Sequence, residues 1–258
     1  MLLGLFQDAV SHGIVVGAQT KEEAKKFISM GASESRTFVT GNIKFDYTTP
    51  DGLLEKAKEF KKEFALDKQI WVAGSTHKGE EKIILDAHKR IMETYPDALL
   101  IIAPRRPERF QSVLNLMDKR GFSSVSRSRD KQISETTQVI LADTMGELPM
   151  YYSASSVSFV GGSLLKTGGH NLLEPASLNT PIITGPILYG VEEISNKLQA
   201  NNALEIIHNA EELSKTVCQL LSDSDRHQKM TREAKKVVDE NKGALQKLLK
   251  LILPLLKS

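Results

Sequence analysis

From Gln69 onward, short apolar runs alternate with helical patterns, and this alternation restricts the fold more than any other feature of the chain. The runs are nearly continuous in apolar residues, which is typical of strands that are buried on both faces. Such strands, separated by helices, predict a doubly wound α/β domain with a parallel sheet. The expected strands are residues 70–75, 98–104, 123–128, 138–143, 157–162, 181–186 and 203–208.

The first 46 residues form a different pattern, because they contain one βαβ unit and no more. The expected elements are a strand at 13–19, a helix at 21–31 and a strand at 36–46. One such unit cannot bury both faces of its own sheet, so it extends the main sheet or is the remaining end of a second domain. The resulting division is a βαβ unit at 1–46, a linker and helix at 47–67, a doubly wound α/β domain at 68–241 and an amphipathic helix at 242–258.

The charge and cysteine content exclude several classes of function. The chain has 34 basic and 32 acidic residues, so its net charge of +2 gives no strong attraction to nucleic acid. Cys218 is the single cysteine, which excludes an internal disulfide, a zinc cluster built on thiols and a thiol redox pair. No segment predicts a secretion signal or a membrane span, and a cytoplasmic protein is expected. The carboxylates and histidines form no metal-ligand pattern, so we expect no metal.

A ligand of a doubly wound sheet binds beyond the carboxyl ends of the strands, in the loops that lead into the helices. The first such loop, "GSTHKGEE" at 74–81, has the glycine spacing of a phosphate loop but lacks its lysine and hydroxyl. No strand is followed by G-x-G-x-x-G, the dinucleotide-binding sequence. The sequence therefore argues against a nucleotide triphosphatase and against a nicotinamide oxidoreductase.

The next loop, "PRRPERF", places Arg105 at the tip of a buried strand. A guanidinium there can pair with two oxygens of a phosphate or carboxylate, and we expect Arg105 to bind the ligand. Arg106 and Arg109 are expected to be solvated charges at the start of a helix.

In the loop "ADTMGEL", Thr144 and Glu147 fit a capping box, which accounts for Glu147 without a ligand. Gly146 is not explained in this way, because glycine in a first helical turn costs stability while allowing a base or sugar to approach the backbone. Met145 could pack on a ring or belong to the core.

The stretch "FVGGSLLKTGGHNLLEP" at 159–175 combines a strand exit, two glycine pairs and a helix start near Asn171. The N–H groups of a helix start bind anions, so one interpretation puts a phosphate on this backbone and ribose hydroxyls on Glu174. The alternative is that Asn171 and Glu174 only cap the helix. We favour the ligand.

Together, the stretches "GNIKFD", "STHKGEE", "APRRPERF", "DTMGELPMYY" and "FVGGSLLKTGGHNLLEPA" resemble the 3-deoxy-D-manno-octulosonic acid (Kdo) transferases, which have the two-domain GT-B fold. The resemblance implies a Rossmann-like C-terminal domain and transfer of Kdo from CMP-Kdo to a lipid A precursor in lipopolysaccharide synthesis. It also implies a peripheral position on the cytoplasmic face of the inner membrane for the full-length enzyme, and no cofactor. Its implied CMP site comprises Pro104, Arg105, Met145, Gly146, Glu147, Asn171, Leu172, Leu173 and Glu174, with Gly162, Ser163, Gly169 and His170 as weaker candidates.

The family's N-terminal domain supplies the catalytic base and binds the acceptor, and only its last βαβ piece is matched here. The resemblance therefore implies a truncated polypeptide that binds CMP and is inactive alone. Two alternatives remain open: a stand-alone nucleotide-binding module, and another GT-B enzyme that uses a UDP-sugar. The leucine-rich helix after 241–243 either loses its cover from the N-terminal domain or packs on its own sheet.

Overall fold

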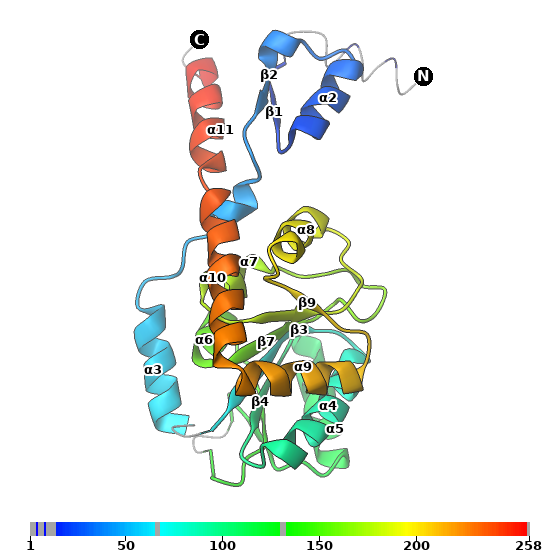
Figure 1. Cartoon of the computed structure of the whole chain (residues 1–258), viewed down its shortest axis with the longest axis vertical. Coiled ribbons are helices and arrows are strands. Elements are labelled where there is room, and N and C mark those ends of the chain that lie inside the picture. The colour runs from blue at the N-terminus through cyan, green and yellow to red at the C-terminus, as the bar shows by residue number, and fades with distance from the viewer. Residues whose placement is uncertain (1–3, 5–7, 9–13, 65–67, 130–132, 257–258) are drawn as a thin grey trace. The chain divides into compact units, whose positions relative to one another are not determined.

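The computed structural model describes residues 4, 8, 14–64, 68–129 and 133–256 (Figure 1). The chain forms two compact units: unit 1 comprises residues 1–48 and 238–258, and unit 2 comprises residues 49–237. The strand expected from residue 13 and any helix in the opening segment fall partly outside the described residues. Each unit is described by itself below.

Unit 2 contains one parallel sheet, in the spatial order β5-β6-β4-β3-β7-β8-β9. The strands are β3 (Ile70–Thr76), β4 (Leu99–Pro104), β5 (Ser124–Ser126), β6 (Val139–Leu141), β7 (Val157–Val160), β8 (Ile182–Thr184) and β9 (Glu205–Ile206). Their order reverses beside β3, since β4, β6 and β5 lie on one side and β7, β8 and β9 on the other. The predicted doubly wound α/β fold is confirmed.

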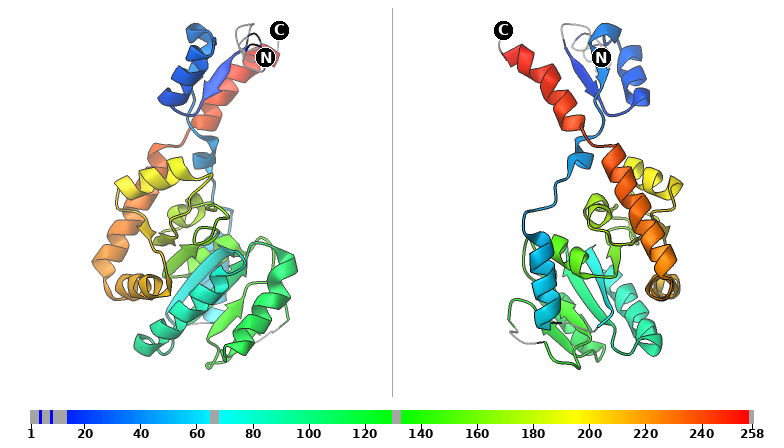
Figure 2. Two further views of the ribbon diagram at one scale, coloured as in Figure 1. Left: turned by 90° about the vertical axis from the view of Figure 1, so that its right-hand side faces the viewer. Right: turned by 60° about the vertical axis from the view of Figure 1, so that its left-hand side comes forward.

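Helices cover both faces of this sheet (Figure 2). Helix α3 (Leu53–Phe64) packs against α6 (Leu148–Ala154) on one face, and α4 (Glu80–Thr94) packs against α9 (Ala210–Ser222) on the other. The remaining helical elements are η3 (Pro107–Arg109), α5 (Phe110–Lys119), α7 (Leu173–Ser177), α8 (Glu192–Ala200) and α10 (Ser224–Glu240), which continues into unit 1.

The core of unit 2 explains why its strands are apolar throughout. Every residue of β4 is buried, and so is every residue of β7. Trp71 in β3 is fully buried, and its indole N–H donates to Nδ1 of buried His88, 3.1 Å away. The polar atom of the largest side chain in the core is thus satisfied.

Unit 1 contains a two-stranded parallel sheet, β1 (Val16–Ala18) with β2 (Thr37–Val39), beside α2 (Lys21–Ser29). The strand expected over 36–46 is therefore wrong beyond residue 39. The chain turns at Gly41, whose φ is +90°, and Asn42 Oδ1 accepts from the Lys44 N–H to start the 3₁₀ helix η2 (Ile43–Asp46). Another short 3₁₀ helix, η1 (Glu34–Arg36), precedes β2.

The C-terminal helices α10 and α11 (Ala244–Ile252) are separated at residues 241–243, as the sequence predicted, and η4 (Leu253–Leu256) follows. Helix α11 belongs to unit 1, so the expectation that it packs on the seven-stranded sheet is wrong. The Asp46 carboxylate accepts from the N–H groups of Gly243 and Leu245 at 2.5 and 2.6 Å. Asp46 thus provides the N-cap that Gly243 lacks.

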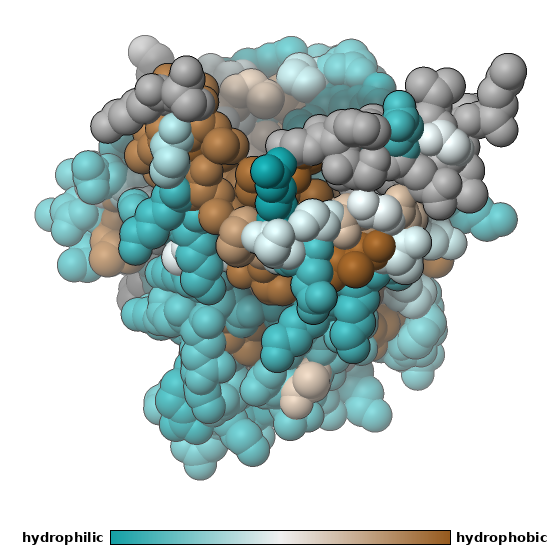
Figure 3. Space-filling model, turned by 90° about the horizontal axis from the view of Figure 1, so that it is seen from above, coloured by the Kyte–Doolittle hydropathy of each residue, from teal (hydrophilic) through white to brown (hydrophobic). Residues whose placement is uncertain are grey.

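Unit 1 exposes many large apolar side chains (Figure 3). They are Ile14, Phe38, Val39, Ile43, Leu245, Leu249, Ile252, Leu253, Leu255 and Leu256. Within the described part of the chain, no helix has the length and apolar character that crossing a bilayer requires.

Candidate functional site

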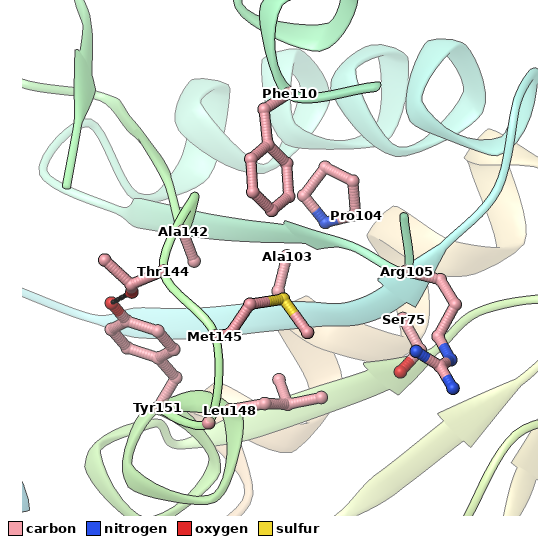
Figure 4. Close-up of a pocket in the computed structure, with 11 residues that line it drawn as sticks. Ser75, Ala103, Pro104, Arg105, Phe110, Ala142, Thr144, Met145, Leu148 and Tyr151 are labelled. Carbon is pink, nitrogen blue, oxygen red and sulfur yellow. Dashed lines mark hydrogen bonds between the residues drawn. The ribbon is translucent and has the colours of Figure 1, made fainter. Parts of the chain in front are cut away.

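The carboxyl ends of three neighbouring strands of unit 2 form a pocket (Figure 4). Its lining is mostly apolar and comes from the ends of β3 and β4, the loop after β6 and the first turns of α5 and α6. The lining residues are Ser75, Ala103, Pro104, Arg105, Phe110, Ala142, Thr144, Met145, Gly146, Leu148 and Tyr151. The structure therefore brings together Pro104, Arg105, Met145 and Gly146, the candidates of two separate loops.

Backbone strain marks the rim of this pocket. Ser75, near the end of β3, has a φ of +55°, in the left-handed region that a side chain disfavours. Non-glycine residues in such conformations cluster at active sites and ligand clamps. Gly146 also has a positive φ, +83°, and a Cβ atom there would meet nothing within 4 Å. Its backbone therefore faces open space beside the pocket, where a planar ligand can approach it.

Arg105 is exposed at the tip of β4, whereas Pro104 is buried. The Arg105 N–H donates to the Thr76 carbonyl at 3.0 Å, which fixes the start of the side chain. Among the described residues, no carboxylate lies within salt-bridge distance of the Arg105 guanidinium. Its charge is nevertheless close enough to His170 and Glu174 to shift their pKa values downward.

Arg109 was expected to be solvated, and this expectation is wrong. Its guanidinium pairs with both carboxylate oxygens of the buried Glu81, at 2.5 and 3.1 Å, and Thr76 Oγ1 donates to the same carboxylate. Arg109 is thus a partner that allows Glu81 to be buried. The expectation for Arg106 is confirmed, since its side chain is 67% exposed beside Glu108.

Met145 lies on the pocket rather than in the core, with 68% of its surface exposed. A large apolar side chain at the mouth of a pocket can cover the face of a bound ring. The alternative that Met145 is a core residue is therefore excluded.

Glu147 does not line the pocket, and the capping box expected for it is not formed. Helix α6 begins at Leu148, and the Thr144 hydroxyl donates to the Glu147 carboxylate instead of accepting from a backbone N–H. The Tyr151 hydroxyl also donates to this carboxylate, at 2.8 Å. Burial raises the pKa of Glu147, but these hydrogen bonds and the charge of Arg127 together bring it below its ordinary value. Glu147 stays ionised and orders the pocket wall.

The glycine pair after β7 wraps around a carboxylate of the protein itself. The fully buried Glu80 accepts from the N–H groups of Gly162, Ser163 and Leu164 at 2.8–3.0 Å, and from that of His77 at 2.8 Å. The N–H groups of Gly162 and Ser163, two of the weaker candidates, are therefore engaged by Glu80 and are not available to a phosphate. The sequence analysis did not select Glu80, although it noted the acidic pair that replaces the lysine of a phosphate loop.

Helix α7 is shorter and begins later than expected. It covers five residues, Leu173–Ser177, and so begins two residues after the start expected near Asn171. A helix of barely more than one turn has too few aligned peptide dipoles to bind an anion. A Cβ atom at Gly169 would lie 2.6 Å from Val191, so close packing explains this glycine.

Asn171 and Glu174 interact with each other, and Asn171 also caps the local turn. Asn171 Nδ2 donates to Glu174 at 3.2 Å, and Asn171 Oδ1 accepts from the Leu173 N–H at 3.0 Å. Leu172 and Leu173 are fully buried, so only their backbone can face a ligand. Burial raises the pKa of Glu174, and the Asn171 hydrogen bond and Arg105 charge oppose that rise. Glu174 is thus half-buried and accepts a hydrogen bond from Asn171. Its carboxylate oxygens can accept further hydrogen bonds, which suits the hydroxyl groups of a ligand.

His77 and His170 meet on the same side of the site, although the sequence separates them by 93 positions. Their rings stack with centroids 4.9 Å apart, and the two Nε2 atoms are 2.7 Å apart. Burial, followed by the nearby charges of His77 and Arg105, lowers the pKa of His170 to about 4. Burial also lowers the pKa of His77.

The described residues include no group of three or more histidine, cysteine, aspartate or glutamate side chains that could hold a metal ion. The polar groups of the site are instead Arg105, the histidine pair and Glu174, beside an apolar pocket. This combination suits a ligand with a flat ring, hydroxyl groups and an acidic group.

Comparison with known proteins shows which family the chain belongs to. Residues 56–237 match the family model of the group 1 glycosyl transferases. The chain is 40% identical over 244 residues to the 3-deoxy-D-manno-octulosonic acid transferase of Haemophilus influenzae, covering 94% of this chain and 57% of that protein. It is 32% identical to the transferase of the same name from Rickettsia typhi, covering 97% of this chain and 54% of the relative. The chain thus spans about half the length of these relatives.

Solved structures agree with the sequence comparison. The C-terminal CMP-Kdo binding domain of WaaA from Acinetobacter baumannii is 33% identical, with a TM-score of 0.70, and the match covers 72% of this chain and 98% of that domain. Anabaena Alr3699/HepE in complex with UDP-glucose is 12% identical with a TM-score of 0.58, over 100% of this chain and 69% of HepE, and shows a shared fold alone. The chain belongs to the group 1 glycosyl transferases, in the family of the Kdo transferases.

Proposed function

We propose that unit 2 binds the donor CMP-Kdo for a Kdo transferase that acts in lipopolysaccharide synthesis. The observation that supports this most directly is the strand-end pocket, which lies in a domain 33% identical to the CMP-Kdo binding domain of WaaA. Its apolar lining suits the base of CMP, the exposed guanidinium of Arg105 suits the phosphate, and the half-buried carboxylate of Glu174 suits the ribose.

In this proposal the cytosine ring lies in the pocket. Pro104 and Phe110 form one wall, Met145 covers the ring, and the backbone at Gly146 allows close approach. Rings bound in apolar clefts gain from such area burial, and a few polar groups fix their orientation. Glu174 accepts hydrogen bonds from ribose hydroxyls, while Asn171 holds its carboxylate in place.

The reaction we propose forms a bond between the acceptor oxygen and the anomeric carbon of Kdo, and breaks the bond from that carbon to the phosphate oxygen of CMP. Negative charge grows on the departing phosphate, and Arg105 stabilises it, since no carboxylate among the described residues of unit 2 neutralises this guanidinium. The acceptor hydroxyl must lose its proton as it attacks. We assign no base to the described residues.

The acceptor we propose is a lipid A precursor, at the cytoplasmic face of the inner membrane. The relatives named 3-deoxy-D-manno-octulosonic acid transferase support the transfer of Kdo, and the acceptor and its place follow from the family resemblance alone. No cofactor is part of it. A stand-alone nucleotide-binding module, or an enzyme that uses a UDP-sugar, is the alternative that the following experiment separates.

Isothermal titration calorimetry with CMP, UMP and a nicotinamide dinucleotide tests the proposal. We expect saturable binding of CMP, weaker binding of UMP and no binding of the dinucleotide. Arg105→Ala removes a charge-assisted contact with phosphate and should weaken CMP binding about tenfold or more. Arg106→Ala is the matched control, because the Arg106 side chain is 67% exposed, and it should change the affinity less than about twofold.

A preference for UMP would support the UDP-sugar alternative. A folded protein that binds none of the three nucleotides would contradict the proposal.

A further inference from the structure

The histidine pair of unit 2 has a fixed geometry that the proposed contacts with base and ribose do not use. His77 follows β3, and His170 precedes α7. The pair is placed by Glu80, because one carboxylate oxygen, Oε2, accepts both from the His77 N–H and from the Gly162 N–H. His170 lies against Gly162, where an added Cβ atom would come within 2.8 Å of its ring. The two rings are thus held together by one buried anchor.

The distance between the rings defines their protonation. The two Nε2 atoms are 2.7 Å apart, so one of them carries the hydrogen and the other accepts it. In the neutral pair, the ring that donates has an unprotonated Nδ1 atom. One further proton can therefore add at that Nδ1 without breaking the hydrogen bond between the rings, which would leave one positive charge on the pair.

In the protein without ligand, the surroundings of His77 and His170 disfavour a positive charge on the histidine pair. The charged groups that face it are Glu80 and Glu81 from α4, and Arg105, Arg106 and Arg109 from the segment after β4. Both carboxylates are already satisfied, Glu80 by backbone N–H groups and Glu81 by Arg109 and Thr76. The arginines add positive potential. Burial lowers the pKa of His77 and outweighs the opposing charges of Glu80 and Glu81, while Arg109 and Arg106 lower it further. Burial, followed by the charges of His77 and Arg105, lowers the pKa of His170 to about 4.

An acidic ligand group would supply the missing counter-charge. Arg105 has no carboxylate partner within the described part of unit 2, and it acts electrostatically on His170. A phosphate or carboxylate between Arg105 and the rings would favour a protonated pair, because an opposite charge at close range raises the pKa of a histidine.

We propose that the His77–His170 pair, together with Arg105, is the subsite for an acidic group of the donor, and that the pair takes up one proton from solution when this group binds. The proposal rests on the function proposed above. The acidic group is the phosphate of the nucleotide or the carboxylate of the sugar acid. Binding then adds one positive charge to the histidine pair, which was neutral before the group bound.

The test measures proton uptake by calorimetry near pH 7, in buffers with different enthalpies of ionisation. The probes are cytidine, CMP and CMP-N-acetylneuraminic acid, a stable CMP-linked sugar acid. The slope of the observed enthalpy against the buffer enthalpy gives the number of protons taken up. We expect a positive slope for a phosphate-bearing probe, more than about half a proton per nucleotide, and none for cytidine. Uptake with CMP identifies the phosphate, and uptake only with the sugar acid identifies its carboxylate.

His77→Gln and His170→Gln should each abolish the uptake, while His208→Gln should retain it, since His208 is exposed and pairs with Glu212 elsewhere in unit 2. A change in the ionisation of Glu174 on binding cannot be mistaken for this proton uptake. Binding that favours the Glu174 carboxylate releases a proton, which has the opposite sign. Proton uptake is first measured on the unmodified chain, so the test still stands if a histidine variant fails to fold.

The outcomes separate the two proposals. Nucleotide binding without proton uptake, or uptake that persists in both histidine variants, would overturn the subsite while leaving the proposed function standing. The absence of any nucleotide binding would overturn both. In support of the subsite, CMP affinity should rise as pH falls from 8 to 6, by up to about tenfold per pH unit, and His170→Gln should flatten that rise.

Discussion

The two units of this chain bury their apolar side chains to very different degrees. Unit 2 surrounds a seven-stranded sheet with helices on both faces, and whole strands of it are inaccessible to solvent. Unit 1 has two short strands, and the small cluster in its core is built from Val16, Ala32 and Phe27. Among its described residues, ten large apolar side chains are exposed. A two-stranded sheet with one helix has too little area to hide them.

The large apolar core and the candidate site both belong to unit 2. Every candidate site residue lies between 49 and 237, within one compact unit. A rigid sheet is needed there, because the pocket, Arg105 and the histidine pair come from the ends of different strands and must keep their distances. Unit 1 carries none of these groups.

The largest expected effect comes from removing the carboxylate at the centre of unit 2. Glu80→Ala removes the acceptor of four N–H groups, two of them buried and two half-buried, and we expect it to lower the free energy of unfolding by about 4 kcal/mol. Urea unfolding followed by the fluorescence of Trp71 measures it, since this single tryptophan reports on unit 2 alone.

Glu211→Ala is the matched control for Glu80, because Glu211 also lies in the first turn of a helix but is exposed. It should change the free energy of unfolding by less than about 0.5 kcal/mol. A loss below about 1 kcal/mol for Glu80→Ala would show that the loop does not depend on its anchor.

Acid should weaken unit 2 through a histidine outside the site. Burial lowers the pKa of His88 to about 4, whereas an unfolded chain restores its ordinary value near 6.5. Between these two pH values, His88 is protonated in the unfolded state and neutral in the folded state. The stability that neutral His88 contributes is therefore complete above pH 6.5 and is lost as pH falls toward 4. We expect a loss of about 3 kcal/mol over that interval.

His88→Gln should reduce the slope of unfolding free energy against pH, measured by the same Trp71 transition. His170 adds a slope of the same sign, so the informative quantity is the difference between the variant and the parent chain. An unchanged slope in His88→Gln would mean that this histidine does not carry the effect.

The smallest effect should be in unit 1. Leu256 is 75% exposed, so Leu256→Ala should leave the free energy of unfolding within about 0.5 kcal/mol of the parent value. The same substitution at Leu100, fully buried in β4, should cost about 2–5 kcal/mol. Urea unfolding read by circular dichroism covers both units. A similar loss of unfolding free energy for Leu256→Ala and Leu100→Ala would contradict the difference in burial between the two units.

Much of unit 2 could be predicted because its signals are local. Continuous apolar runs determine buried parallel strands, and the carboxyl ends of such strands determine where ligands bind. Arg105, Met145 and Gly146 were found in this way, and the family resemblance added Pro104. In unit 1 the same reasoning extended a strand through Gly41, where a positive φ ends it.

The rest of the site depends on contacts that the sequence does not show. Glu80 binds the N–H groups of residues 82 to 84 positions later, and His77 meets His170 over 93 positions. The buried pair of Glu81 with Arg109 is also long-range. From residue type alone, Arg109 was predicted to be a solvated charge and the glycine loop was predicted to bind phosphate. Both predictions missed the true partners, Glu81 and Glu80, because these lie far away in the sequence.

Hydrogen exchange with and without saturating CMP tests the central claim most directly. We predict that CMP protects the backbone amides of residues 142–151 and 170–176, at the strand ends of unit 2, and leaves residues 14–48 and 244–256 of unit 1 unchanged. Protection confined to unit 1, or no protection at the strand ends when CMP is bound, would contradict the assignment of donor binding to unit 2.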